Sequence, residues 1–293
     1  MPELPEVETM RRGIAEIAGS TIVRVSRTPC QCKPILIQPA IATINRRVAG
    51  QPISQVRRVG KRIVLELVDA SALVIEPRMT GLVLISDPPT PDHLRLRIQL
   101  ASGPHPQLLF WDRRGLGTFR WYSAAQKTVA LGPSRIGVDA LVADVDQLRQ
   151  LFSGSQRPIK VALLDQAKLA GVGNLYAAEV LFVAGIDPRL RCDRLTAAQW
   201  KRLHAALKLV LLEAIAHEGS TLGDGTYRNA LNSPGRYQNH HRVYNRQGSV
   251  CPRCQQGIIR RIVQAQRATF FCSVCQRKQG LHHSAIDVAT VQK

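Results

Sequence analysis

Four cysteines near the carboxyl end constrain this chain more than any other feature. They form two Cys-x-x-Cys pairs, Cys251 with Cys254 and Cys272 with Cys275, and 17 residues separate the pairs. Each pair places two thiolates on a tight turn, and two such turns complete a tetrahedral zinc site. A redox dithiol is the alternative, but two matched pairs are unusual for it. Four protein ligands leave no open position, so we expect one structural Zn²⁺ ion.

The segment between the two pairs combines apolar residues with three arginines. Arg260 and Arg261 follow two isoleucines, and Arg267 stands in Gln266-Arg267-Ala268-Thr269-Phe270. A zinc-held β-hairpin that carries arginines is suited to reading a nucleic-acid duplex. We expect Arg260 and Arg261 to be solvated.

The charge of the whole chain also indicates a polyanionic partner. The 293 residues include 40 Lys and Arg against 21 Asp and Glu, a net charge of +19 that is spread along the chain. Basic membrane-surface proteins compete with this interpretation, but neither a basic amphipathic helix nor a lipidation signal is present. There is no long apolar run and no signal-peptide pattern. We therefore expect an intracellular, nucleoid-associated protein that does not bind membranes and whose cysteines form no disulfides.

The hydrophobic pattern divides the chain into two halves. Residues 6–18 predict an amphipathic helix, and residues 21–122 read mostly as strands. The alternation is strict over 94–100, and shorter candidate strands cover 63–67, 72–75, 82–85 and 108–111. The first half is therefore expected to be antiparallel sheet with one leading helix, within an α+β protein.

The second half is predicted to be helical. Thr196 and Gln199 have capping-box spacing, and they open a helix expected to run to about Glu218 before Gly219. Leu203, Leu207, Leu211 and Ile215 recur every four residues along it and are expected in the core. The predicted organisation is a β-sandwich domain, a linker, a helical domain, a zinc hairpin and a tail, over residues 1–125, 126–143, 144–244, 245–276 and 277–293.

The amino terminus reads Met1-Pro2-Glu3-Leu4-Pro5-Glu6. Removal of Met1 would expose Pro2 as a secondary amine beside the Glu3 carboxylate, a nucleophile with its own general acid. The pKa of an amino-terminal amine is about 8, far below that of a lysine. The iminium that such an amine forms would be an electron sink. The bland alternative is that the prolines are a spacer and the acids suit the first turn of a helix.

This start resembles that of the formamidopyrimidine-DNA glycosylase family, bifunctional enzymes that remove oxidised purines from DNA. The related endonuclease VIII branch typically has Pro-Glu-Gly-Pro, so Leu4 favours the purine-repair branch. The resemblance extends over about residues 1–276. It includes Gly171-Val172-Gly173-Asn174 with the helix that follows, similar to the helix-two-turn-helix motif, and the segment 266–270, similar to the zinc-finger motif.

The resemblance implies a role for each matching residue. Pro2 is the catalytic amine and Glu3 its acid, and Lys61 and Arg267 complete the catalytic group. Lys61, Asn174 and Arg267 hold the DNA backbone, and Lys160 lies close to the damaged nucleotide. Glu6 is expected to help order the site.

Three further residues resemble those that fill the gap left by an extruded base. Met79 matches the first of them. Residues 112–117 read Asp-Arg-Arg-Gly-Leu-Gly where the family has Asp-Pro-Arg-Arg-Phe-Gly, so Arg114 faces the orphaned base. Leu116 stands where phenylalanine is usual and offers less stacking area, which affects lesion searching and opposite-base preference.

The sequence supports weaker predictions for several further residues. The helix start at Asn174 could bind phosphate through its N–H groups. Glu179 is expected to be a structural hydrogen-bonding group, with a supporting role near Pro2 as the alternative. His217, His240 and His241 are read as surface or structural residues. Residues 224–237 occupy the region of the family's base-recognition loop, without residue-level assignment.

The sequence therefore predicts a monomeric glycosylase and lyase that acts on damaged double-stranded DNA. The expected fold is a two-layered antiparallel β-sandwich with a leading helix, a helix-two-turn-helix domain and a zinc-finger hairpin. Two alternatives remain open. One is a pyrimidine-directed enzyme of the endonuclease VIII branch, and the other is a DNA-binding protein without catalytic activity.

Overall fold

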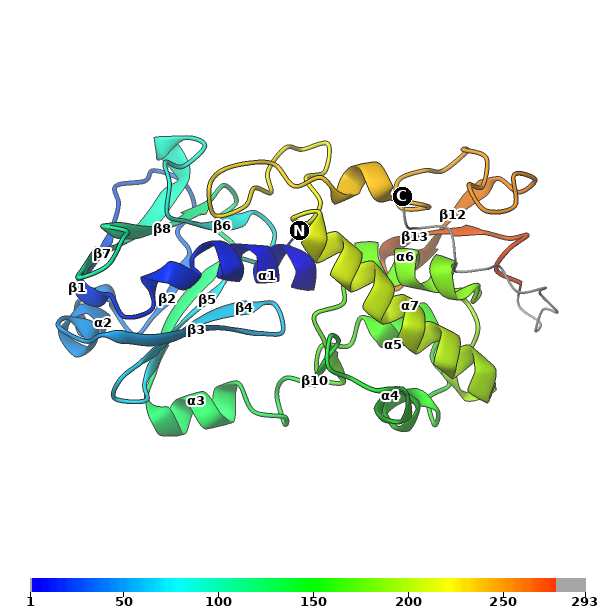
Figure 1. Ribbon diagram of the computed structural model, residues 1–293, viewed down its shortest axis with the longest axis horizontal. Helices are drawn as coiled ribbons and strands as arrows, with labels where there is room; N and C mark the ends of the chain where they lie inside the picture. Colours follow the sequence, from blue (N-terminus) through cyan, green and yellow to red (C-terminus); the bar gives the residue numbers. More distant parts are fainter. Residues whose placement is uncertain (1, 278–293) are drawn as a thin grey trace.

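The computed structural model describes residues 2–277 and has a sheet half and a helical half. Figure 1 shows strands gathered at one end, helices at the other, and the hairpin of β12 and β13 beside the helices. The first helix lies between the two halves, next to the long helix α7.

The sheet half begins with a helix and contains most of the strands. Its helices are α1 (Leu4–Gly13), α2 (Ile41–Val48) and α3 (Ala124–Ala130), with single 3₁₀ turns η1 (Ala15–Ile17) and η2 (Pro91–His93). Its strands are β1 (Thr21–Arg27), β2 (Leu36–Gln38), β3 (Ile53–Val59), β4 (Arg62–Leu67), β5 (Ala72–Glu76), β6 (Gly81–Leu84), β7 (Leu94–Ala101), β8 (Gln107–Asp112) and β9 (Thr118–Tyr122).

The helical half follows, and the hairpin comes after it. Its elements are β10 (Val138–Asp139), α4 (Val145–Phe152), α5 (Ile159–Leu163), β11 (Leu169–Ala170), α6 (Asn174–Ala184), η3 (Cys192–Arg194), α7 (Ala197–Ala216) and η4 (Tyr237–His240). The hairpin strands are β12 (Ile259–Gln264) and β13 (Arg267–Cys272). Ala265 and Gln266 between them both have positive φ, the geometry of a tight two-residue hairpin turn.

Two sheets form the predicted sandwich. One has the order β1-β7-β8-β6 and the other β2-β9-β5-β4-β3, and their pairings are antiparallel except for β2 with β9. Leu65 and Leu73 of one sheet share a buried core with Leu96 and Leu109 of the other. The α+β fold class is thus confirmed.

Local details differ from the sequence-based expectation. The first helix is α1, which starts two residues earlier than expected because Pro5 fits a first turn that needs no N–H, and it ends at Gly13. Residues 41–48 form α2 within the region read as strands, burying Ile44 and Val48. The alternation in strand β7 predicts a solvent-facing Arg95, yet this residue is 4% exposed.

Helix α1 belongs to both halves of the molecule. Leu4 is buried in the core of the helical half, whereas Val7 and Met10 are buried in the core of the sandwich. Residues 4–10 of α1 are all buried, including the carboxylates of Glu6 and Glu8. Both cores therefore fix the first residues of the chain, which is the prerequisite for a site built on the amino terminus.

The helical half packs α6 against α7. Thr196 and Gln199 form the predicted capping box, with Thr196 N donating to Gln199 Oε1 at 2.8 Å and Gln199 N to Thr196 Oγ1 at 3.2 Å. The four apolar residues spaced along α7 are buried, as predicted. Among the described residues, no helix has the length and apolarity needed to span a bilayer.

The segment between the halves is more ordered than a plain linker. Residues 126–143 include most of α3 and all of β10, which pairs in parallel with β11. The expected tail lies outside the described residues, apart from Arg277.

Candidate active site

Glu3 is bound at the amino-terminal end of α6. Its carboxylate is 3% exposed and accepts hydrogen bonds from Gly173 N at 2.6 Å, Leu175 N at 3.0 Å and Tyr176 N at 3.4 Å. A helix start supplies free N–H groups and a partial positive charge, so it stabilises a buried carboxylate. Pro2, also buried, is thereby fixed next to α6.

The two glycines before α6 leave the space that this contact needs. A Cβ on Gly173 would lie 2.3 Å from the carboxyl carbon of Glu3, and Gly171, at φ 108°, would meet the Leu4 side chain. Leu4 N also donates to Gly171 O at 3.0 Å. Three of the helix-start N–H groups that were expected to bind phosphate are therefore bound by Glu3 of the chain itself.

Behind Glu3, the carboxylate of Glu6 joins three parts of the chain. Glu6 Oε2 accepts from Glu3 N at 2.8 Å, while Oε1 accepts from Tyr176 OH at 2.5 Å and Ser220 N at 2.9 Å. Burial raises the pKa of Glu6, and the neighbouring Glu3 charge raises it further. The sequence suggested an ordering role for Glu6 but gave no sign of Tyr176 or Ser220, which are distant in the chain.

A small pocket opens beside Pro2. Its wall combines Pro2, Met79 and Thr80 with the loop that follows α7, of which Ser220, Leu222, Asp224, Thr226 and Tyr227 contribute. The structure thus places the candidate nucleophile and one candidate gap-filling residue on the same cavity. This loop overlaps residues 224–237, the region that the resemblance assigned to the family's base-recognition loop without naming individual residues.

Three predicted cationic residues and Asn174 gather near Glu3. Lys61 Nζ donates to Val172 O at 3.0 Å, and burial lowers its pKa. Lys160 is fully buried and donates to Asn174 Oδ1 at 2.6 Å, and burial, then the charge of Arg267, lowers its pKa to about 8. Asn174 Nδ2 donates to Ala268 O at 3.0 Å, which ties α6 to the hairpin that carries the exposed Arg267. The charge of Arg267 contributes to the lowered pKa of both lysines, and such a group of cations is suited to binding an anion.

The three predicted gap-filling residues lie on two connected loops. Met79 is exposed and lines a groove together with Leu116 and Arg267, and Arg114 is exposed nearby in sequence. The buried carboxylate of Asp112 connects the loops, because it accepts from Thr80 Oγ1 at 2.5 Å, Arg114 N at 3.2 Å and Gly117 N at 2.8 Å.

Arg95 supports the same loop, a role that its sequence context did not indicate. Its guanidinium donates to Asp112 O at 2.8 Å and also contacts Arg113 O at 3.5 Å. In the sequence, Arg95 is one of the polar residues that alternate with apolar residues along β7. Such a position is usually solvated, so the pattern does not indicate a buried arginine.

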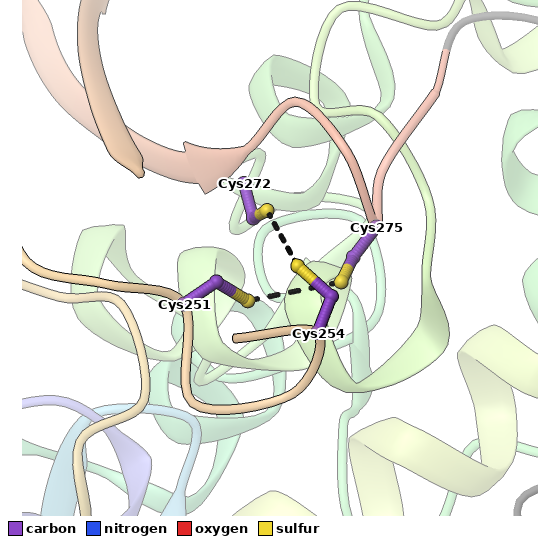
Figure 2. A group of neighbouring side chains, drawn as sticks. All are labelled: Cys251, Cys254, Cys272 and Cys275. Atoms are coloured by element: carbon purple, nitrogen blue, oxygen red, sulfur yellow. Dashed lines mark hydrogen bonds between the residues drawn. The ribbon is translucent and has the colours of Figure 1, made fainter. Parts of the chain in front are cut away.

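The four hairpin cysteines converge on one point (Figure 2). Cys251 and Cys275 have sulfurs 3.7 Å apart, those of Cys254 and Cys272 are 3.8 Å apart, and all four lie within 4.8 Å of one another. Thiolates bound at about 2.3 Å around a tetrahedral ion would lie about 3.8 Å apart. The residues therefore fit a four-thiolate metal site.

Glu179 has the structural role that was expected first. It is fully buried on α6 and accepts from the backbone N–H groups of Arg242, Val243 and Tyr244 at 2.8 to 2.9 Å. It therefore anchors the segment that leads to the hairpin, and its hydrogen bonds do not reach Pro2.

Comparison with known families identifies the class of protein. The family model of the formamidopyrimidine-DNA glycosylase N-terminal domain matches residues 1–119, and that of the H2TH domain of the same glycosylases matches residues 136–225. Curated proteins named formamidopyrimidine-DNA glycosylase are among the relatives of this chain. The Chloroflexus aggregans protein is 39% identical over 94% of this chain and 98% of its own length, and the Laribacter hongkongensis protein is 35% identical over 94% and 100%.

Solved structures agree with this class. A Lactococcus lactis Fpg mutant bound to Fapy-dG DNA superposes with a TM-score of 0.82 at 33% identity, covering 94% of this chain and all of the other. MutM bound to carbocyclic 8-oxo-G DNA gives a TM-score of 0.81 at 31% identity over the same shares. The chain belongs to the formamidopyrimidine-DNA glycosylase family.

Proposed function

We propose that this protein is a base-excision repair glycosylase and lyase that removes oxidised purines, such as 8-oxoguanine and formamidopyrimidines, from duplex DNA. The observation that carries the proposal is the placement of Pro2. It is buried at a cavity, beside a carboxylate bound by α6 and within a group of basic residues. The protein acts as a monomer on damaged DNA, and the related structures are complexes of Fpg with such DNA.

The reaction begins with attack by the Pro2 amine on C1′ of the damaged nucleotide. The new N–C1′ bond replaces the bond to the base, which leaves with its electron pair and takes up the proton that the Pro2 nitrogen loses. Glu3 protonates or hydrogen-bonds the sugar ring oxygen as the C1′–O4′ bond breaks, and the opened sugar is left as an iminium of Pro2. The resulting iminium accepts electrons during eliminations on both sides, which cut the strand and leave a gap with phosphate ends. Glu6 keeps Glu3 in place through the Glu3 N–H.

The basic residues hold the backbone that brings the nucleotide to Pro2. Lys61, Lys160, Asn174 and Arg267 surround the Glu3 end of α6 and contact phosphates near the lesion. Met79, Leu116 and Arg114 fill the gap left in the duplex, with Arg114 facing the orphaned base. Because phosphate contacts release counterions, binding weakens steeply with salt.

The remaining assignments complete the proposal. Zn²⁺ is the metal of the four-cysteine site, where it would hold the hairpin that carries Arg267. The boundaries expected from sequence, at 125, 143, 244 and 276, stand as our proposed divisions of the chain.

Borohydride trapping tests the chemistry. The enzyme, with its mature amino terminus defined by mass spectrometry, is incubated with an abasic duplex and sodium borohydride. We expect a covalent adduct that Pro2→Gly abolishes, because the primary amine of a glycine lacks the proline ring and its geometry. Tight binding without an adduct would instead support a DNA-binding protein without activity.

A pyrimidine substrate is the second candidate. A Lactococcus lactis Fpg structure contains oxidised-pyrimidine DNA, so this fold admits such a base. Duplexes with 8-oxoguanine or thymine glycol, compared at equal concentration, separate the two specificities. We expect faster nicking at 8-oxoguanine, and the reverse order would favour the pyrimidine-directed reading.

A further inference from the structure

His241 lies directly behind the pocket that contains Pro2. It follows η4, and its side chain is 6% exposed. The imidazole Nε2 lies 2.9 Å from the hydroxyl of Ser220. A buried histidine in contact with a pocket-lining hydroxyl is more than a surface residue.

Ser220 is the residue through which His241 meets the site. It is 4% exposed and begins the loop wall of the pocket. Its N–H donates to Glu6, which fixes its backbone. Its hydroxyl has a long contact of 3.5 Å to Tyr176 OH, whose own proton goes to Glu6 at 2.5 Å. Within residues 2–277, His241 is therefore the one close side-chain partner of this hydroxyl.

The η4 segment holds the next loop residue as well. Thr221 N donates to Gln238 Oε1 at 2.9 Å, and Thr221 Oγ1 accepts from Gly235 N at 2.8 Å. His241 and Gln238 thus fasten two consecutive residues at the start of the pocket loop. The loop cannot shift at this end without breaking the hydrogen bonds of Ser220 and Thr221.

The imidazole is in the form that this contact needs. Burial, followed by the charges of Arg246, His240 and Arg242, lowers the pKa of His241 to about 4. At neutral pH the ring is uncharged, and its Nε2 can accept the hydroxyl proton.

We propose that His241 is a positioning residue that fixes Ser220, and through it the loop wall beside Pro2 against which the oxidised purine is placed. The inference rests on the proposed function. It separates two steps, because the pocket is needed to excise a base, whereas an abasic site has no base to place. His241 therefore governs excision and leaves amine attack on an abasic sugar intact.

The test compares two readouts in metal-loaded enzyme. One is single-turnover excision of 8-oxoguanine from a duplex, and the other is borohydride trapping on an abasic duplex. His241→Leu should slow excision about tenfold, the effect of leaving one buried hydroxyl unpaired, and should leave trapping unchanged. His241→Gln, which can return an acceptor near the Nε2 position, should restore most of the rate.

His240→Leu is the matched control. His240 is the adjacent residue, is exposed and stacks on His217 at 3.8 Å between ring centroids. The hydrogen bonds found for Ser220 go to Glu6, Tyr176 and His241, and none of them goes to His240. We expect wild-type values for both readouts. Ser220→Ala should reproduce the His241→Leu result, and the double variant should be no slower than either single variant, because both changes remove the same hydrogen bond.

Three results would overturn the inference. They are wild-type excision by His241→Leu, a parallel loss of trapping in a variant that melts normally, and additive losses in the double variant. If His241→Leu does not fold, Ser220→Ala and His241→Gln decide the question with the same two readouts. Absence of trapping in the wild type would instead defeat the proposed function.

Discussion

At the scale of single residues, we expect Lys160 to set how DNA binding responds to pH. It is fully buried beside Asn174, and its pKa is lowered to about 8, so it loses its proton as the pH rises through that value. A phosphate requires the charged form. We expect affinity for an abasic duplex to fall about tenfold from pH 7 to pH 9, because about one lysine in eleven keeps its proton one unit above its pKa.

Fluorescence anisotropy at fixed salt measures this dependence. Lys160→Met should bind more weakly at pH 7 and show a flatter pH profile, to which Lys61 still contributes because its pKa is lowered too. Lys127→Met is the control, since Lys127 lies on α3 and pairs with Glu66. A Lys160→Met protein with the full wild-type slope would contradict the assignment.

At the scale of elements, the contact between α1 and α6 depends on Gly173 having no side chain. Gly173→Ala would push a methyl group against the Glu3 carboxylate and break hydrogen bonds to a buried charge. We expect a loss of about 2 kcal/mol or more in the free energy of unfolding, measured by urea denaturation, together with a loss of borohydride trapping.

Gly154→Ala is the matched control for this substitution. Gly154 also lies just outside a helix, yet a Cβ there meets no atom within 4 Å. We expect stability and trapping close to wild type. Equal effects of the two substitutions would mean that the contact with Glu3 is unimportant.

At the scale of the whole molecule, the hairpin has a hydrophobic core of its own. The hairpin core contains Cys251, Cys272 and Phe270 and packs on Phe182 of α6, separate from the sandwich core. Removing the metal with a chelator should therefore unfold the hairpin and leave the sandwich folded. DNA affinity should fall about tenfold or more, because the hairpin carries Arg267 and contacts to charged groups contribute about 1.5–3 kcal/mol each.

Near-ultraviolet circular dichroism and anisotropy, before and after readdition of Zn²⁺, measure the two effects. Arg267→Ala in the metal-loaded protein should reproduce part of the loss in affinity without the spectral change. Full DNA binding by metal-free protein would show that the hairpin is dispensable.

The sequence predicted what depends on local spacing. The cysteine pairs, the capping box at Thr196 and the strands around residues 63–67 and 94–100 follow from patterns a few residues long, and the structure has them. The family resemblance added Pro2, Glu3 and the DNA contacts, whose roles stay predictions.

Long-range packing set the limits of the sequence analysis. Arg58 and Lys61 stand in one basic run, yet Arg58 is paired with Glu8 and Asp139 while Lys61 faces the site. The Gly-x-Gly segment gave no sign that the Gly173 N–H donates to Glu3, which is 170 residues away. His241 likewise meets Ser220 only through the path of the chain after α7. No local pattern encodes such partners.

The burial of Pro2 and Glu3 against α6 has a practical consequence for anyone producing the enzyme. A purification tag fused ahead of Pro2 would convert its amine into an amide and push extra residues toward the cavity beside it. Recombinant protein should therefore carry its tag at the other terminus, or regain a native first residue by proteolytic cleavage. Otherwise the tag itself could cause a preparation to be inactive, and the activity of the native enzyme would stay untested.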